Sequence, residues 1–111
     1  MSLVSKTQKI RTALTGIENL KCYHLMKPSS VTAPYCVWQE DSEGQSHYAN
    51  NSKGEQVIQA TVDYFTQTEY DAMIDTIQGA LNSAGIAWRL NSFQYEDTTK
   101  LLHYEWLCEV I

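Results

Sequence analysis

Three cysteines, three histidines and a few neighbouring carboxylates are the residues of this 111-residue chain that could do chemistry. A zinc site needs four Cys, His or carboxylate ligands at short, fixed spacings, and only Cys22 and His24 lie that close. The other candidates, Cys36, His47, His103 and Cys108, are widely spaced. We therefore expect no metal site, and we interpret the cysteines as small buried apolar groups.

Nucleophilic and acid–base catalysis find equally little support in the pattern. His103 and Cys108 lie five positions apart on one predicted strand, so their side chains should point to opposite faces. The glycines lack the spacing of phosphate-binding loops. The clustered carboxylates sit in polar, turn-like surroundings that do not raise a carboxyl pKa. We therefore predict a non-enzymatic protein without a cofactor. These carboxylates are Glu40, Asp41, Glu43, Glu96 and Asp97.

Charge argues against direct nucleic-acid binding. The chain has 8 Lys+Arg against 13 Asp+Glu, a formal net charge of −5 and a pI near 5.0, whereas non-specific binding depends on cations that neutralise phosphates. The strand aromatics alternate with Asp63, Glu105 and Glu109 instead of Lys or Arg, unlike a stacking platform for single strands. We expect these aromatics to pack in the core and between subunits.

Two helices and five strands are predicted around these residues. Apolar side chains at helical spacing predict a first helix over 4–17 that ends near Gly16, and alternation predicts strands over 19–26, 35–38 and 57–65. A capping-box spacing from Thr66 to Glu69 predicts a second helix, with Tyr70 on its apolar face and Gly85 just past its end. A fourth strand is expected to begin with residues 86–90, and a turn at 96–100 joins it to a fifth strand over 102–110.

This order, α-β-β-β-α-β-β, predicts a single α+β domain over residues 1–111. We expect a mostly antiparallel sheet of about five strands with two helices on one face. A mass of 12.7 kDa with 43% hydrophobic residues suits one modest core. The absence of a signal-like apolar run and the odd cysteine count lead us to expect a protein of a reducing cytoplasm, not one in a membrane.

The segment 40–55 is the longest polar stretch, and it predicts an exposed connection that contacts a partner. A β-hairpin, with 46–49 paired back onto the second strand, is the alternative. The first helix should also present a basic face to an acidic neighbour. The residues proposed for these two contacts are, in the connection, Glu40, Asp41, Glu43, His47, Tyr48 and Lys53, and, on the helix, Lys6, Lys9 and Arg11.

Taken together, the order of elements, the polar segment 48–51, the strand 56–65, the capped helix from Thr66 and the aromatic strand 102–107 resemble one family. The chain is similar to the tail-terminator or tail-completion proteins of long-tailed bacteriophages, which are also met as minor tail or minor capsid proteins of prophages. The resemblance extends over nearly the whole chain. It implies a structural virion protein that forms a hexameric ring, caps the growing tail tube and presents a surface to the filled head.

The resemblance also implies the partners and the location. The partners would be further copies of the chain, the major tail-tube protein and a head-completion or connector protein, while DNA would only pass through the ring. The acidic composition suits such a lumen, because like charge prevents DNA from adsorbing. The protein would be found in the virion tail, and in the host bacterial cytoplasm during assembly.

Two other functions remain open at this point. One is a different head–tail joining or minor capsid component. The other is a small cytoplasmic α+β domain that binds a ligand on the open face of its sheet and acts as a regulator.

Overall fold

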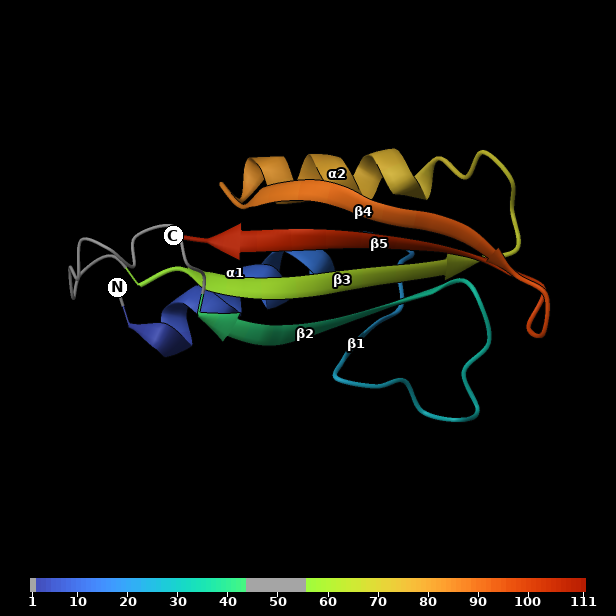
Figure 1. Ribbon diagram of the computed structural model, residues 1–111, viewed down its shortest axis with the longest axis horizontal. Helices are drawn as coiled ribbons and strands as arrows, with labels where there is room; N and C mark the ends of the chain where they lie inside the picture. The colour runs from blue at the N-terminus through green and yellow to red at the C-terminus, as the bar shows by residue number, and fades with distance from the viewer. Residues whose placement is uncertain (1, 44–55) are drawn as a thin grey trace.

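A mixed sheet and two helices make up the computed structural model, which describes residues 2–43 and 56–111 (Figure 1). The predicted α+β class and the order of elements are confirmed. Neither helix of the described ranges has the length and apolar character needed to span a bilayer. The elements are α1 (Leu3–Thr15), β1 (Cys22–His24), β2 (Tyr35–Glu43), β3 (Ile58–Thr66), α2 (Met73–Ser83), β4 (Ala87–Glu96) and β5 (Leu101–Val110).

The strands lie in the order β1-β2-β3-β5-β4. Within the described residues β1 pairs parallel with β2, and the other neighbouring strands pair antiparallel, as the sequence predicted for most of the sheet. β3 and β5 form its centre, where Val62 lies opposite Trp106, and Trp106 lies opposite Leu90 of β4. The two edges are therefore unlike: a ten-residue strand on one side and a three-residue strand on the other.

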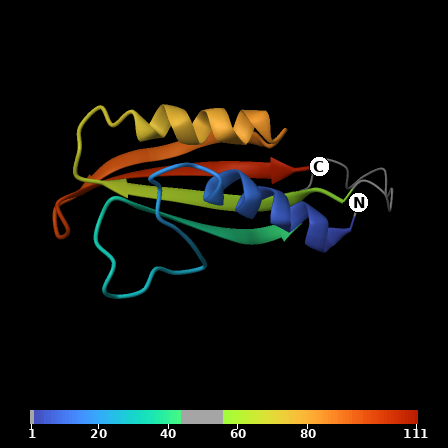
Figure 2. The same cartoon turned by 180° about the vertical axis from the view of Figure 1, so that it is seen from behind.

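Both helices pack on the same face of the sheet (Figure 2). Ile10 and Leu14 of α1 and Ile77 and Leu81 of α2 are fully buried in one core with the strands. Alternation puts every second strand residue into this core because successive side chains point to opposite faces. The expected arrangement of two helices on one face is confirmed.

β2 is longer than the sequence predicted. It was expected over 35–38, but it continues to Glu43 and pairs with β3 up to the Glu43–Ile58 partners, with an irregularity between Glu40 and Ser42. The ladder depends on backbone groups, so the polar side chains after Trp38 do not end it. The first four residues of the predicted connection over 40–55 are therefore strand residues, and Asp41, Ser42 and Glu43 among them are exposed as predicted.

The predicted start of the second helix is also wrong. Thr66 is the last residue of β3, and α2 begins at Met73. The Asp71 carboxylate accepts hydrogen bonds from the Met73 N–H at 2.9 Å and from the Thr66 hydroxyl at 2.7 Å, so it takes over the capping role. Tyr70, expected on the apolar face of the helix, is almost fully exposed with a φ of 56°. Gly85 does adopt the left-handed conformation predicted just past the helix, with a φ of 74°.

Candidate functional site

The sheet face opposite the helices, called here the open face, carries six charged strand side chains besides His103 in the part of the chain that the structure describes. It consists of the outward positions of the four long strands β2, β3, β5 and β4. Lys27, from the loop after β1, lies over the Tyr35 ring with its Nζ 5.4 Å from the ring centroid. In the described strands the charged residues of this face, His103 apart, are five carboxylates and one guanidinium: Asp41, Asp63, Glu96, Glu105, Glu109 and Arg89.

His103 links three strands on this face. Its Nε2 lies 2.7 Å from an oxygen of Asp63 on β3, and its Nδ1 lies 3.2 Å from an oxygen of Glu96 on β4. The ring stacks on Phe65 with 4.1 Å between centroids, and Phe65 in turn stacks on Tyr35 at 4.9 Å. The hydrogen bond with Asp63, reinforced by the charges of both carboxylates, raises the pKa of His103 above its ordinary value. The imidazolium can then donate to both carboxylates at once.

We expect His103→Gln to lower the free energy of unfolding by about 1 kcal/mol below pH 6, because glutamine keeps hydrogen bonds but not charge. The folded-state pKa of His103 lies above the unfolded value, near 6.5, so this contribution is complete below that pH. It should vanish as the pH rises through the folded-state pKa. Urea unfolding of both proteins between pH 5 and 9 measures the difference.

The matched control is His24→Gln. His24 also contacts a carboxylate, with 2.7 Å between its Nε2 and an oxygen of Glu40, but its ring is exposed at the sheet edge. A smaller effect is therefore expected. If the difference in the free energy of unfolding between wild type and His103→Gln stays constant across the pH range, the proposed pairing of a charged His103 with Asp63 and Glu96 is wrong.

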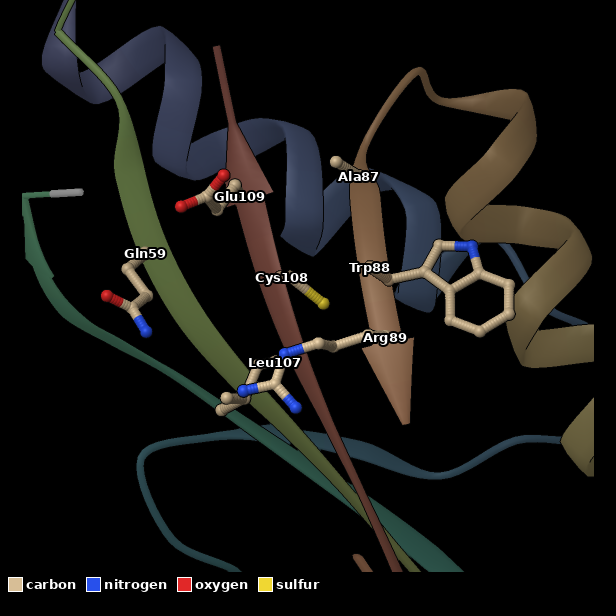
Figure 3. A pocket seen from close by; sticks show the side chains of 7 residues that line it. All are labelled: Gln59, Ala87, Trp88, Arg89, Leu107, Cys108 and Glu109. Atoms are coloured by element: carbon tan, nitrogen blue, oxygen red, sulfur yellow. The ribbon is translucent and has the colours of Figure 1, made fainter. Parts of the chain in front are cut away.

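A shallow groove of about 330 Å³ lies at the other end of the open face (Figure 3). Gln59, Arg89, Leu107 and Glu109 line it from β3, β4 and β5, while the Trp88 ring turns towards α2, where its Nε1 donates to Asn82 at 2.8 Å. The groove offers a guanidinium, a carboxylate and an amide beside an apolar side chain. These groups can orient a small polar molecule by hydrogen bonding.

The thiols contribute no evident nucleophile to this face. Burial raises the pKa of Cys108, another groove residue, to about 12, so its thiol stays protonated at neutral pH. Its side chain is fully buried on the helix side, whereas His103 lies on the open face, so the predicted separation of these two residues is confirmed. Cys22 and Cys36 are register partners on β1 and β2, and their hydrogen bond, together with burial, raises the pKa of Cys36. Within 2–43 and 56–111, no three His, Cys, Asp or Glu side chains are grouped so as to hold a metal ion.

The three carboxylates at the start of the predicted connection belong to β2, where they line a groove of about 430 Å³ together with Leu3 and Val4 of α1. Glu40 contacts His24 at the short edge of the sheet, Asp41 accepts a hydrogen bond from the Thr61 hydroxyl on the open face, and Glu43 ends β2. They therefore lie on a strand and not in a loop, and their contact with a partner stays a prediction. The remaining members of that prediction, His47, Tyr48 and Lys53, lie outside the described residues.

The predicted basic face of the first helix is only partly present. Lys6 is 3% exposed and its ammonium donates to the backbone carbonyl of Gln56, so it is not available to a partner. Its aliphatic stem can pack against the core while its charge meets an oxygen. Lys9 is half-buried and Arg11 is exposed, so the accessible cation on this face is chiefly Arg11.

Sequence reasoning missed the Asp63–His103–Glu96 cluster. It assigned Glu96 to a solvated turn, whereas Glu96 ends β4 half-buried beside His103. The alternation of side chains along each strand could have placed Asp63 and His103 on the open face, since both occupy outward positions. Alternation identifies the face, but it does not show which residues on that face contact one another.

These features define a small α+β protein with an acidic open sheet face and two unlike sheet edges. A scan against protein-family models gives no match to the chain, and a search of curated proteins gives none either.

Proposed function

We propose that the chain is a non-enzymatic tail-terminator protein of a bacteriophage or prophage, which forms a ring on the tail tube and joins it to the head. The observation that carries this proposal is the acidic open face. A subunit that turns this face inwards would line a lumen with carboxylates, and DNA would pass without adsorbing to it. The resemblance in element order described above supports the same function.

The unlike sheet edges are a second support. A ring requires heterologous contacts, in which one patch of a subunit meets a different patch of the next. A chain with a long edge strand on one side and a short one on the other provides two such patches. The virion tail, and the host cytoplasm before assembly, are the locations that follow from this proposal.

Electron microscopy of tail tubes, assembled from the major tail protein of the same phage or prophage, tests the function. We expect the purified chain to cap one end of each tube and to stop its elongation. Glu105→Lys combined with Glu109→Lys should still cap tubes but lower the yield of infectious particles, because cations in the lumen bind the passing DNA. The glutamine pair at these positions is the control. Tubes that grow unchanged and uncapped would refute the proposal, and binding to head connectors alone would favour another joining component.

The groove favours one alternative, a small domain that binds a ligand as a regulator. Arg89, Glu109 and Gln59 could hold a polar metabolite there. A thermal-shift screen against small metabolites tests this alternative. A stabilising compound whose effect disappears in Arg89→Ala, without tube capping by the wild-type chain, would favour it.

A further inference from the structure

The long edge of the sheet exposes an apolar strip. β4 pairs with β5 alone among the described strands, so the backbone groups of its outer side have no strand partner there. Leu90, Phe93 and Tyr95 on its helix side are 43%, 58% and 54% exposed. Phe93 stacks on the buried Tyr104 with 4.3 Å between centroids, so the core holds the strip in place. We call Leu90, Phe93 and Tyr95, with Glu96 and the adjoining Asp97, the β4 flank.

The short edge exposes a second apolar site. Directly after β1, Leu25 and Met26 are 61% and 75% exposed. Hydrogen bonds from the Leu25 N–H to the Trp38 carbonyl at 2.8 Å and from the Met26 N–H to the His24 carbonyl at 2.9 Å fix the backbone there. We call Leu25 and Met26, with the neighbouring Lys21 and Lys27, the β1 flank. The β1 flank and the β4 flank lie at opposite margins of the sheet (Figure 1).

The two flanks carry opposite charge. The first 27 residues hold five Lys or Arg, of which Lys6 is buried, and a single carboxylate at Glu18. Residues 66–100, which include α2 and β4, hold five carboxylates against Arg89 and Lys100. On the β1 flank the apolar side chains adjoin Lys21 and Lys27, and on the β4 flank they adjoin Glu96 and Asp97, with Lys100 in the same turn. Such complementarity fixes the partner and the register of an association.

We infer that the partner of each flank is a second copy of this chain, with the β4 flank of one copy docked on the β1 flank of the next. This inference rests on the proposed ring function and names the surfaces that form the ring. Pairing of two β4 flanks across a two-fold axis would close at a dimer, whereas a flank that meets a different flank can continue around a ring. The charges of the two flanks favour the second arrangement.

Two single substitutions, one in each flank, test the assignment. Tyr95→Lys places a cation opposite the lysines of the β1 flank, and Met26→Glu places a carboxylate opposite those of the β4 flank. Both side chains are more than half exposed, so the folded state should survive, and melting temperatures check this. Each variant alone should need at least about tenfold more protein than wild type for half-maximal self-association or tube capping. Light scattering across a concentration series and electron microscopy with tubes measure these two quantities.

A one-to-one mixture of the two variants should associate again. One copy then offers an intact β1 flank to the intact β4 flank of the other, and the altered flanks carry opposite charge. Tyr70→Lys, which changes an exposed tyrosine outside both flanks, is the control and should behave as wild type.

The possible failures are distinguishable. If wild type assembles and caps tubes but Met26→Glu has no effect, or the mixture does not recover, the flank assignment is wrong and the tail function stands. If wild type stays monomeric at every concentration and caps no tubes, the proposed function fails and this inference fails with it.

Discussion

Trp106→Ala is expected to lower the free energy of unfolding by about 4 kcal/mol. Trp106 is fully buried at the centre of the sheet, between Val62 of β3 and Leu90 of β4. Its Nε1 donates to the Gln78 side chain of α2 at 3.0 Å, so the residue joins the sheet to the helix. Alanine would leave a cavity and remove the donor that Gln78 accepts from. Urea unfolding followed by far-ultraviolet circular dichroism measures the loss.

Trp88→Ala is the matched control for this prediction. Trp88 makes the same kind of bond to α2, from its Nε1 to Asn82 at 2.8 Å, but its ring is only half-buried. Trp88→Ala should therefore lower the free energy of unfolding by about half as much as Trp106→Ala. Equal losses for the two variants would mean that the hydrogen bond to α2, and not the burial of the ring, dominates the stability at these positions.

The sequence predicted the faces of the strands well because burial on one side produces a period of two. Ala60, Val62 and Tyr64 alternate with Gln59 and Asp63, and the structure places the first group in the core and the second on the open face. The same reasoning correctly separated His103 from Cys108. The charge polarity between the N-terminal part and the rest of the chain was also visible in the sequence.

The meeting of side chains across strands could not be predicted in this way. Asp63 and His103 are forty positions apart, and their contact depends on the register of β3 against β5. Glu96 reaches the same histidine because β4 is irregular between Leu90 and Ser92, a shift that local composition does not reveal. The sequence therefore indicated an acidic face without its histidine cluster.

Two local predictions failed for a different reason, which is competition from tertiary contacts. The helical spacing of Lys6, Lys9 and Arg11 predicted that Lys6 lies on an exposed basic surface. Lys6 is instead buried, because its ammonium donates to the backbone carbonyl of Gln56 near the start of α1. Thr66 has the capping-box spacing to Glu69, but it is the last residue of β3. In both cases a contact with a residue distant in the sequence, Gln56 for Lys6 and the strand partner Leu102 for Thr66, overrode the local spacing.

The carboxylate that caps the start of α2 is that of Asp71, and its removal is the second large effect that we expect. Its carboxylate accepts hydrogen bonds from the Tyr64 hydroxyl at 2.7 Å, the Thr66 hydroxyl at 2.7 Å and the Met73 N–H at 2.9 Å. Tyr64 and Thr66 are almost fully buried. Asp71→Ala would leave two buried hydroxyls unpaired and the helix uncapped, so we expect a loss of about 3 kcal/mol in the free energy of unfolding at pH 7.

The pH dependence distinguishes this network from a simple packing defect. Burial alone would raise the pKa of the Asp71 carboxyl, but the hydrogen bonds from Met73, Tyr64 and Thr66 outweigh burial and lower it. The stabilisation by the ionised carboxylate is therefore complete above the unfolded pKa, near 3.9, and is lost as the pH falls through the folded-state value. The gap in stability between wild type and Asp71→Asn should accordingly narrow between about pH 5 and pH 2. Asp75→Asn, at an exposed position in the first turn of α2, should show little change over the same range. If the difference in the free energy of unfolding between wild type and Asp71→Asn does not depend on pH, the shape of the Asp71 side chain and not its charge would account for its effect.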